Sequence, residues 1–166
     1  MEEDDTLVRE DDPKSPCNIS SESCRLYFKG LIKEETTTVL AGYGVAICDK
    51  DNNLLFQTKG SLHDSATTVL EAELMALSRG LIEVVRLRIT HIAIYCDYQT
   101  IFELVMGRYA LEQDNIALLM DDVQRIRQQL RSSVPVLVTE DQTKFAYKLA
   151  METIVSEVSI TKTSYR

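Results

Sequence analysis

The sequence lacks the cysteine and histidine patterns that hold structural zinc ions. It has only two histidines, and its four cysteines show neither CxxC spacing nor a histidine at zinc-binding spacing. Cys48 and Cys96 lie within apolar segments, where a cysteine is most simply a small buried hydrophobic residue. Cys17 and Cys24 lie nearer the N-terminus. The composition therefore predicts four free thiols in a reducing compartment and excludes a zinc finger of ordinary spacing.

Long hydrophobic runs are also absent. No segment approaches the roughly 18 consecutive apolar residues that indicate a membrane-spanning helix. The first residues, MEEDDTLVREDD, are acidic, whereas a secretory signal peptide begins with a basic region. We therefore expect an intracellular protein, cytoplasmic or nuclear, that has no membrane partner.

Positive charge is scarce, because 18 Lys and Arg residues stand against 26 Asp and Glu residues, a net charge of −8. Residues 1–12 alone carry −6, which leaves −2 for the rest of the chain. Such a run of acids, followed by prolines and serines, predicts an acidic disordered tail over residues 1–23, with an interaction tail as the alternative. The near-neutral remainder has no strong general attraction for phosphates, so nucleic-acid binding requires a local basic patch.

The rest of the chain alternates between strand and helix patterns. Strand patterns cover residues 25–32, 42–49, 54–60, 91–96 and 134–140, and helical spacing covers residues 68–88, 98–107, 114–131 and 143–158. The turn sequence KDNN joins the second and third strands as a hairpin. The last helix is predicted to pack through Phe145, Leu149 and Ile154.

This order of elements predicts an α/β domain over residues 24–160, followed by a C-terminal tail of residues 161–166. Three consecutive strands in a meander and then strand–helix crossovers imply a mixed five-stranded sheet. Its first three strands are antiparallel, and helices flank it.

Two acids lie on adjacent elements of this predicted domain. The helix over residues 68–88, capped by Thr67 or Thr68, has one apolar stripe, made by Leu70, Leu74, Leu77, Leu81 and Val84. Glu73 lies at the edge of this stripe, about 60° from its middle. Asp97 follows the alternating strand HIAIYC directly. The Asp97 carboxylate therefore lies where a buried strand reaches the surface. The preceding helix carries the second carboxylate, that of Glu73.

With this element order, the phrases AELMALSRGL and IYCDYQTI resemble the ribonuclease H fold over nearly all of the predicted domain. In that family, four carboxylates hold two divalent ions, Mg²⁺ or Mn²⁺, which ready a water and stabilise the leaving oxygen of a phosphodiester. The resemblance implies that Glu73 and Asp97 are two of these catalytic, metal-binding acids. The other two positions fall on Lys29 in LYFKG and on Tyr147 in FAYKLA, and Thr143 stands where the family often has Asn.

Lys29 changes the electrostatics of such a site. At about 4 Å, the repulsion between an ammonium and a metal ion is on the order of several kcal/mol, even at an effective dielectric of about 20. We therefore expect weak metal binding or none, and no cofactor unless the protein is an enzyme that uses Mg²⁺ or Mn²⁺. Either Lys29 pairs with Asp97, and with Glu73 as well, or it extends to solvent while Asp97 caps the next helix. The sequence leaves both alternatives open.

Five further phrases are similar to the ribonuclease-H-like region that precedes the zinc-binding domains of some plant RING-between-RING ubiquitin ligases. These phrases are LYFKGL, GYGVAICD, VMGRY, IALLMDDVQRIR and FAYKLA. Those ligases transfer ubiquitin through a module rich in cysteine and histidine, which this sequence does not contain. The resemblance implies a ligase-associated domain, present as a fragment, a shortened relative or a stand-alone copy, and does not assign ligase activity to it.

Two functions follow from these resemblances. The first is a degenerate ribonuclease H-like domain that acts as a nucleic-acid-binding or protein-interaction module, with RNA, DNA, an RNA–DNA hybrid or a protein as partner. The second is an active RNA–DNA hybrid ribonuclease that keeps Glu73 and Asp97 and recruits another acid. Asp141 is the best candidate for that acid, and Asp49 and Glu71 are the others. The two replaced carboxylates favour the first function, and a purely structural domain is a third alternative.

Overall fold

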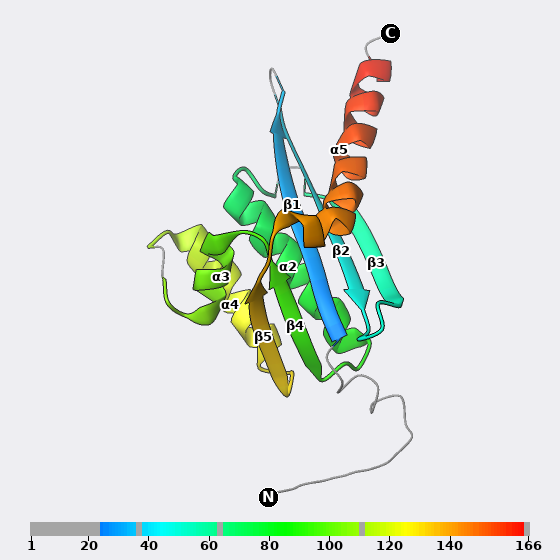
Figure 1. Cartoon of the computed structure of the whole chain (residues 1–166). Coiled ribbons are helices and arrows are strands. Elements are labelled where there is room, and N and C mark those ends of the chain that lie inside the picture. The colour runs from blue at the N-terminus through cyan, green and yellow to red at the C-terminus, as the bar shows by residue number, and fades with distance from the viewer. Residues whose placement is uncertain (1–23, 36–37, 63–64, 110–111, 165–166) are drawn as a thin grey trace, which may run out of the picture.

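The computed structural model describes residues 24–35, 38–62, 65–109 and 112–164, with side chains described up to residue 156. The acidic tail predicted for residues 1–23 lies outside the described residues. In chain order, the elements are β1 (Cys24–Glu34), β2 (Val39–Cys48), β3 (Leu54–Ser61), α2 (Val69–Arg86), β4 (His91–Cys96), α3 (Gln99–Met106), α4 (Asp114–Arg127), β5 (Ser132–Leu137), η1 (Glu140–Thr143) and α5 (Lys144–Ser164) (Figure 1).

The strands form one mixed sheet in the order β3-β2-β1-β4-β5. β1, β2 and β3 are antiparallel neighbours, whereas β4 and β5 run parallel to β1. α2 covers one face, with α4 packed against it, and α5 crosses the other face (Figure 1). The predicted five-stranded sheet with antiparallel first strands and flanking helices is therefore confirmed.

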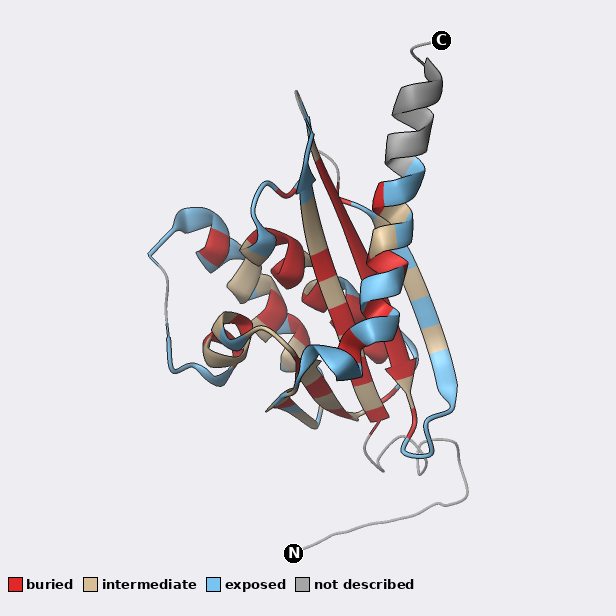
Figure 2. Cartoon of the chain, turned by 45° about the horizontal axis from the view of Figure 1, so that its top comes forward, coloured by how far each residue is buried: buried red, intermediate tan, exposed pale blue. Residues whose placement is uncertain are grey.

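β1 is the central strand, and its side chains alternate between the two faces of the sheet. Leu26 and Phe28 are fully buried beneath α2, whereas Tyr27 and Lys29 lie on the face that α5 partly covers. Because residues two apart on a strand share a face, Lys29 and Tyr27 are neighbours on the α5 side, with Cα atoms about 7 Å apart. The centre of the sheet thus separates an apolar core from a more open, mixed surface (Figure 2).

The apolar stripe of α2 forms much of that core, since Leu74, Leu77, Leu81 and Val84 are all fully buried. Gly30 allows the helix to approach the sheet, because a Cβ atom added to it would lie 2.2 Å from the carbonyl carbon and oxygen of Ala72. The backbone of α2 therefore rests directly on β1 at the turn that carries Glu73. This contact fixes where the Glu73 side chain can reach.

Several predicted boundaries and one predicted core residue were wrong. β1 continues to Glu34 and β2 begins at Val39, beyond the predicted strand ranges of residues 25–32 and 42–49. α5 continues to Ser164, whereas the helical pattern was predicted to end at residue 158. Phe145 is 47% exposed, whereas Leu149 and Ile154 are buried as predicted. The buried face of α5 begins instead at Ala146, so Phe145 lies at its margin.

Within the described ranges, no helix combines the length and the apolar character needed to cross a bilayer.

The contact at Gly30 predicts that this residue has no tolerance for a larger side chain. We expect Gly30→Ala to lower the free energy of unfolding by about 1–3 kcal/mol, because the added methyl group would push α2 away from β1. Gly42→Ala is a matched control on the neighbouring strand, since its nearest atom would be the Thr153 Cβ at 3.1 Å. Urea denaturation measures both variants, and equal losses would contradict the prediction.

Candidate functional site

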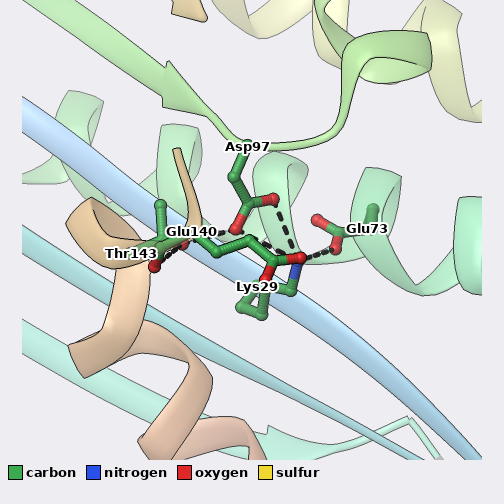
Figure 3. Close-up of polar contacts among 5 residues, drawn as sticks. All are labelled: Lys29, Glu73, Asp97, Glu140 and Thr143. Carbon is green, nitrogen blue, oxygen red and sulfur yellow. Dashed lines mark hydrogen bonds and ion pairs between the residues drawn. The ribbon is translucent and has the colours of Figure 1, made fainter. Parts of the chain in front are cut away.

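The two predicted acids and Lys29 meet where β1 and β4 stop pairing. The paired register ends at Tyr27 opposite Tyr95, so two residues further on Lys29 faces Asp97 without a ladder between them. Glu73 enters this opening from α2, beside Gly30. Figure 3 shows the three charged side chains converging from the strand, the helix and the loop that follows β4. The end of this strand pair therefore provides a place for buried charge within an apolar sheet.

The ammonium of Lys29 lies between the two carboxylates. Its Nζ atom is 2.9 Å and 3.1 Å from the two Asp97 oxygens and 3.1 Å from Oε2 of Glu73. The side chains of Lys29, Glu73 and Asp97 are 14%, 1% and 2% exposed. The structure thus has the ion pair rather than a lysine extended to solvent. Asp97 does not cap α3, whose N-cap is Tyr98 and which has no side-chain cap bond.

Burial controls the protonation of this cluster. It raises the pKa of Glu73 to about 7, and the nearby ammonium of Lys29 only partly opposes this effect. Neither Glu73 oxygen has a hydrogen-bonding partner in suitable geometry among the described residues. For Lys29, burial lowers the pKa of the ammonium, but Glu73 and Asp97 together outweigh it and raise that pKa above its usual value of 10.5. Lys29 therefore stays charged, while Glu73 can hold a proton near neutral pH.

η1 holds Asp97 in place from the opposite side. The hydroxyl of Thr143 donates a short hydrogen bond to the Asp97 carboxylate, and it also lies 3.2 Å from the carbonyl oxygen of Glu140 (Figure 3). Thr143 is only 1% exposed. Asp97 therefore accepts bonds from an ammonium and a hydroxyl at once, which fixes the orientation of its carboxylate.

A cavity of about 430 Å³ opens over this cluster. Of its lining residues, Thr143 is buried and Lys29 and Asp97 are half-buried, whereas Glu140, Asp141, Lys144 and Tyr147 are exposed. The structure thus brings Tyr147 and Asp141 to the same cavity as Asp97. Asp141 is 83% exposed, however, and it lies 3.6 Å from the ammonium of Lys144.

The two other candidate acids have structural roles elsewhere. Glu71 forms a capping box with Thr68 at the start of α2, which confirms Thr68 as the cap, and it accepts a hydrogen bond from Asn115. Asp49 closes the β2–β3 turn, where its Oδ1 accepts hydrogen bonds from the backbone of Asp51 and Asn53, each at 2.9 Å. Neither side chain lines the cavity over Asp97.

The residues at this site do not fit a divalent metal ion. Mg²⁺ needs about six oxygen ligands at about 2.0–2.1 Å. Here the Lys29 ammonium fills the position between Asp97 and Glu73, within 3.1 Å of both carboxylates. Among the described residues, no group of three or more His, Cys, Asp or Glu side chains is arranged to hold a metal. The arrangement supplies a neutralised ion cluster rather than an open ligand set.

Comparison with known proteins shows the family to which this chain belongs. Residues 28–153 match the sequence model of the family described as "Reverse transcriptase-like". The chain belongs to this reverse transcriptase-like family. It is also 54% identical, over 136 residues, to the E3 ubiquitin-protein ligase RSL1 of Arabidopsis thaliana. The alignment covers 82% of this chain but only 34% of that relative, so the chain spans about a third of the relative's length.

Solved structures show the same fold. The N-terminal RNase H domain of rv2228c from Mycobacterium tuberculosis superposes with a TM-score of 0.75 at 22% identity, covering 85% of this chain and 99% of that one. RNase H1 from Halobacterium salinarum gives a TM-score of 0.73 at 16% identity, with 81% and 98% covered. LC11-RNase H1, solved with an RNA/DNA hybrid, gives 0.72 at 20% identity, with 82% and 99% covered. This reverse transcriptase-like chain therefore has the predicted ribonuclease H fold.

The resemblance placed Thr143 near the site, but sequence reasoning missed its contact with Asp97 and the position of Glu140. The contact of the Thr143 hydroxyl with Asp97 joins residues 46 positions apart, and no local pattern indicates it. Glu140 lies on the same cavity because η1 turns it toward the end of β4. The available signal was the phrase TEDQT, in which acids stand just ahead of the last helix.

Removing the ammonium of Lys29 should be costly. We expect Lys29→Met to lower the free energy of unfolding by about 3–5 kcal/mol near pH 8, because two buried carboxylates would lose their counter-charge. Lys33→Met, on the same strand, is the matched control, since its exposed ammonium lies 3.8 Å from Glu35 and such pairs contribute about 0–1 kcal/mol. Chemical denaturation that found both variants equally stable would refute the prediction.

The raised pKa of Glu73 predicts a pH dependence of stability. The pKa of the Glu73 carboxyl is 4.5 in the unfolded chain and about 7 in the folded chain. Between these pH values, the folded state therefore binds one more proton than the unfolded state. The stability that Glu73 contributes is therefore full at low pH and is lost as the pH rises through about 7. We expect the free energy of unfolding to fall relative to that of Glu73→Gln between about pH 5 and about pH 8. Denaturation curves at several pH values test this, and a constant difference would disprove it.

Proposed function

We propose that this reverse transcriptase-like domain is not a nuclease and that it works as a binding module. The observation that carries the proposal is the position of the Lys29 ammonium, within 3.1 Å of both Asp97 and Glu73. A divalent ion between these carboxylates would have to displace a buried cation that both acids already neutralise. The chemistry of the fold's enzymes depends on such ions, so the exchange of metal for lysine favours binding over catalysis.

The relationship to RSL1 supports a place within ubiquitin-ligase architecture. That relative is named an E3 ubiquitin-protein ligase, and this chain matches about a third of it at 54% identity. A domain that recognises another molecule is a natural part of a ligase, because substrate choice in such a protein requires binding. We propose that the domain serves recognition, with a protein or a nucleic acid as its partner.

The alternative is an active hybrid ribonuclease. It is favoured by the retained acids Glu73 and Asp97, by Asp141 on the same cavity, and by the LC11-RNase H1 structure with an RNA/DNA hybrid. Against it, Asp141 is 83% exposed and lies beside Lys144 rather than beside Asp97. A substitute ligand of this kind would have to leave its own ion pair and would still meet the Lys29 ammonium.

Catalysis and metal binding can be tested together. We expect the purified chain to leave a labelled RNA–DNA hybrid intact in Mg²⁺ or Mn²⁺, and to give no binding heat when titrated with Mg²⁺ in a calorimeter. The double variant Lys29→Asp and Tyr147→Asp restores a carboxylate at both replaced positions. It should bind Mg²⁺ measurably, because the repelling ammonium is exchanged for an oxygen ligand.

Cleavage by the wild-type chain would refute the proposal if both Glu73→Gln and Asp97→Asn abolished it. Cleavage that survived these substitutions would identify a contaminating nuclease and leave the wild-type chain inactive, as proposed. Circular dichroism of each variant checks that the fold is retained.

A further inference from the structure

Two cavities lie on either flank of η1 and the first turn of α5. The first is the polar cavity over Asp97. The second is a groove of about 270 Å³ lined by Tyr27, Ala46, Cys48, Leu54, Gln142 and Phe145. Lys29 lines the first and Tyr27 lines the second, and these residues are two apart on β1 with Cα atoms about 7 Å apart. The two cavities are therefore close enough for one short segment of another molecule to reach both.

The polar cavity carries an excess of negative charge. Three carboxylates line it, those of Asp97, Glu140 and Asp141, against the ammonium groups of Lys29 and Lys144. Lys29 is already bound by Asp97 and by the buried Glu73, and Lys144 lies 3.6 Å from Asp141. The Glu140 carboxylate has no hydrogen bond or ion pair to another described residue. In Figure 3, its side chain extends from η1 across the ion cluster.

This lining suits a cationic side chain. A guanidinium or ammonium group would form charge-assisted hydrogen bonds with the carboxylate of Glu140, and such bonds are stronger than bonds between neutral groups. Tyr147 is 46% exposed at the same cavity and offers an aromatic ring to a cation. In the ion cluster below, Asp97 and Glu73 are already paired with Lys29, so the attraction acts at the mouth of the cavity.

The groove on the other flank is almost wholly apolar. Phe145 is 47% exposed and Leu54 is 48% exposed, although both are large hydrophobic residues. A volume of about 270 Å³ lies below the roughly 300–1,000 Å³ of small-molecule pockets, so the groove suits a side chain rather than a whole ligand. Exposed aromatic residues beside such a groove are typical of the anchor points of protein interfaces.

We infer that the surface around η1 binds a protein segment that inserts a basic side chain into the polar cavity and an apolar side chain into the groove. This inference rests on the proposed binding function and names the class of its partner. Neither cavity fits the other residue type, because a buried apolar group gains nothing from Glu140 and a cation would lose its water in the apolar groove. The two cavities together therefore select a segment that carries both a basic and an apolar side chain.

Charge disfavours the other occupants of this surface. Nucleic-acid phosphates would meet the carboxylates of Glu140 and Asp141 on a domain with no net positive charge to attract them, since residues 13–166 carry −2. Residues 1–12 carry −6 and would be repelled in the same way, and a second copy of the chain would bring the same excess of acid. A basic protein segment is the occupant whose charge complements the surface.

The inference can be tested by selecting random short peptides, displayed on phage, against the immobilised full chain. We expect the enriched peptides to carry Arg or Lys next to a large apolar residue. A synthetic copy of an enriched peptide, labelled for fluorescence polarisation, then gives the dissociation constant. Its affinity should fall as salt is raised, because the basic side chain binds at an exposed site.

Two variants and two matched controls locate the binding site. We expect the double variant Glu140→Gln and Asp141→Asn, and separately Phe145→Ala, each to raise the dissociation constant about tenfold, a loss of about 1.4 kcal/mol. The controls are Glu112→Gln with Asp121→Asn, which makes the same change of charge on exposed residues, and Leu118→Ala, which truncates a residue that is 66% exposed on α4. Each control should leave the constant within about twofold.

Enriched peptides without a basic residue, an absence of enrichment, or equal binding by site and control variants would overturn the inference. So would displacement of the peptide by an RNA–DNA hybrid. The proposed function would fail on a different result, cleavage of the hybrid by the wild-type chain. The two failures can therefore be told apart. All the substituted side chains are exposed, so thermal unfolding should confirm that the variants remain folded.

Discussion

The buried ammonium of Lys29 is the interaction on which the arrangement of this site depends. Asp97 reaches it at the end of the β1–β4 ladder and Glu73 reaches it beside the glycine contact beneath α2, while Thr143 in the 3-10 turn before α5 holds Asp97. Glu73 and Asp97 would otherwise be two carboxylates held out of water within an apolar core. The Lys29 ammonium lowers the electrostatic cost of burying these two carboxylates.

This ion cluster fixes the orientation of its side chains more than it adds to the free energy of unfolding. Taking ions out of water costs free energy that the ion pairs repay only in part, and apolar replacements of buried pairs are often neutral or stabilising. What the cluster provides is a defined orientation, because Asp97 is held by both Lys29 and Thr143. The ribonuclease H fold thus keeps its framework here while the charge at its centre is changed, and fold alone does not decide function.

Local sequence patterns predicted most of the fold. Three predicted features are present: the apolar stripe of α2, the cap of α2 at Thr68 and the end of α3 at Gly107. Each of them depends on residues within a few positions along the chain. The exposure of Phe145 could not be predicted, because it depends on which side of α5 meets the sheet. For the site, the resemblance placed Lys29 among the acids, but periodicity carries no information on a contact made through η1. The positions of Glu140 and of the Thr143 hydroxyl follow from tertiary structure.

The central place of β1 also affects how the chain can fold. On one edge β1 pairs with β2, the next strand along the chain, whereas on the other edge it pairs with β4, and the bond from Lys29 to Asp97 joins residues 68 positions apart. Contacts of this separation slow folding, and an open strand edge invites pairing with other chains. A charged side chain on that edge opposes such pairing, since it would have to be buried without a partner.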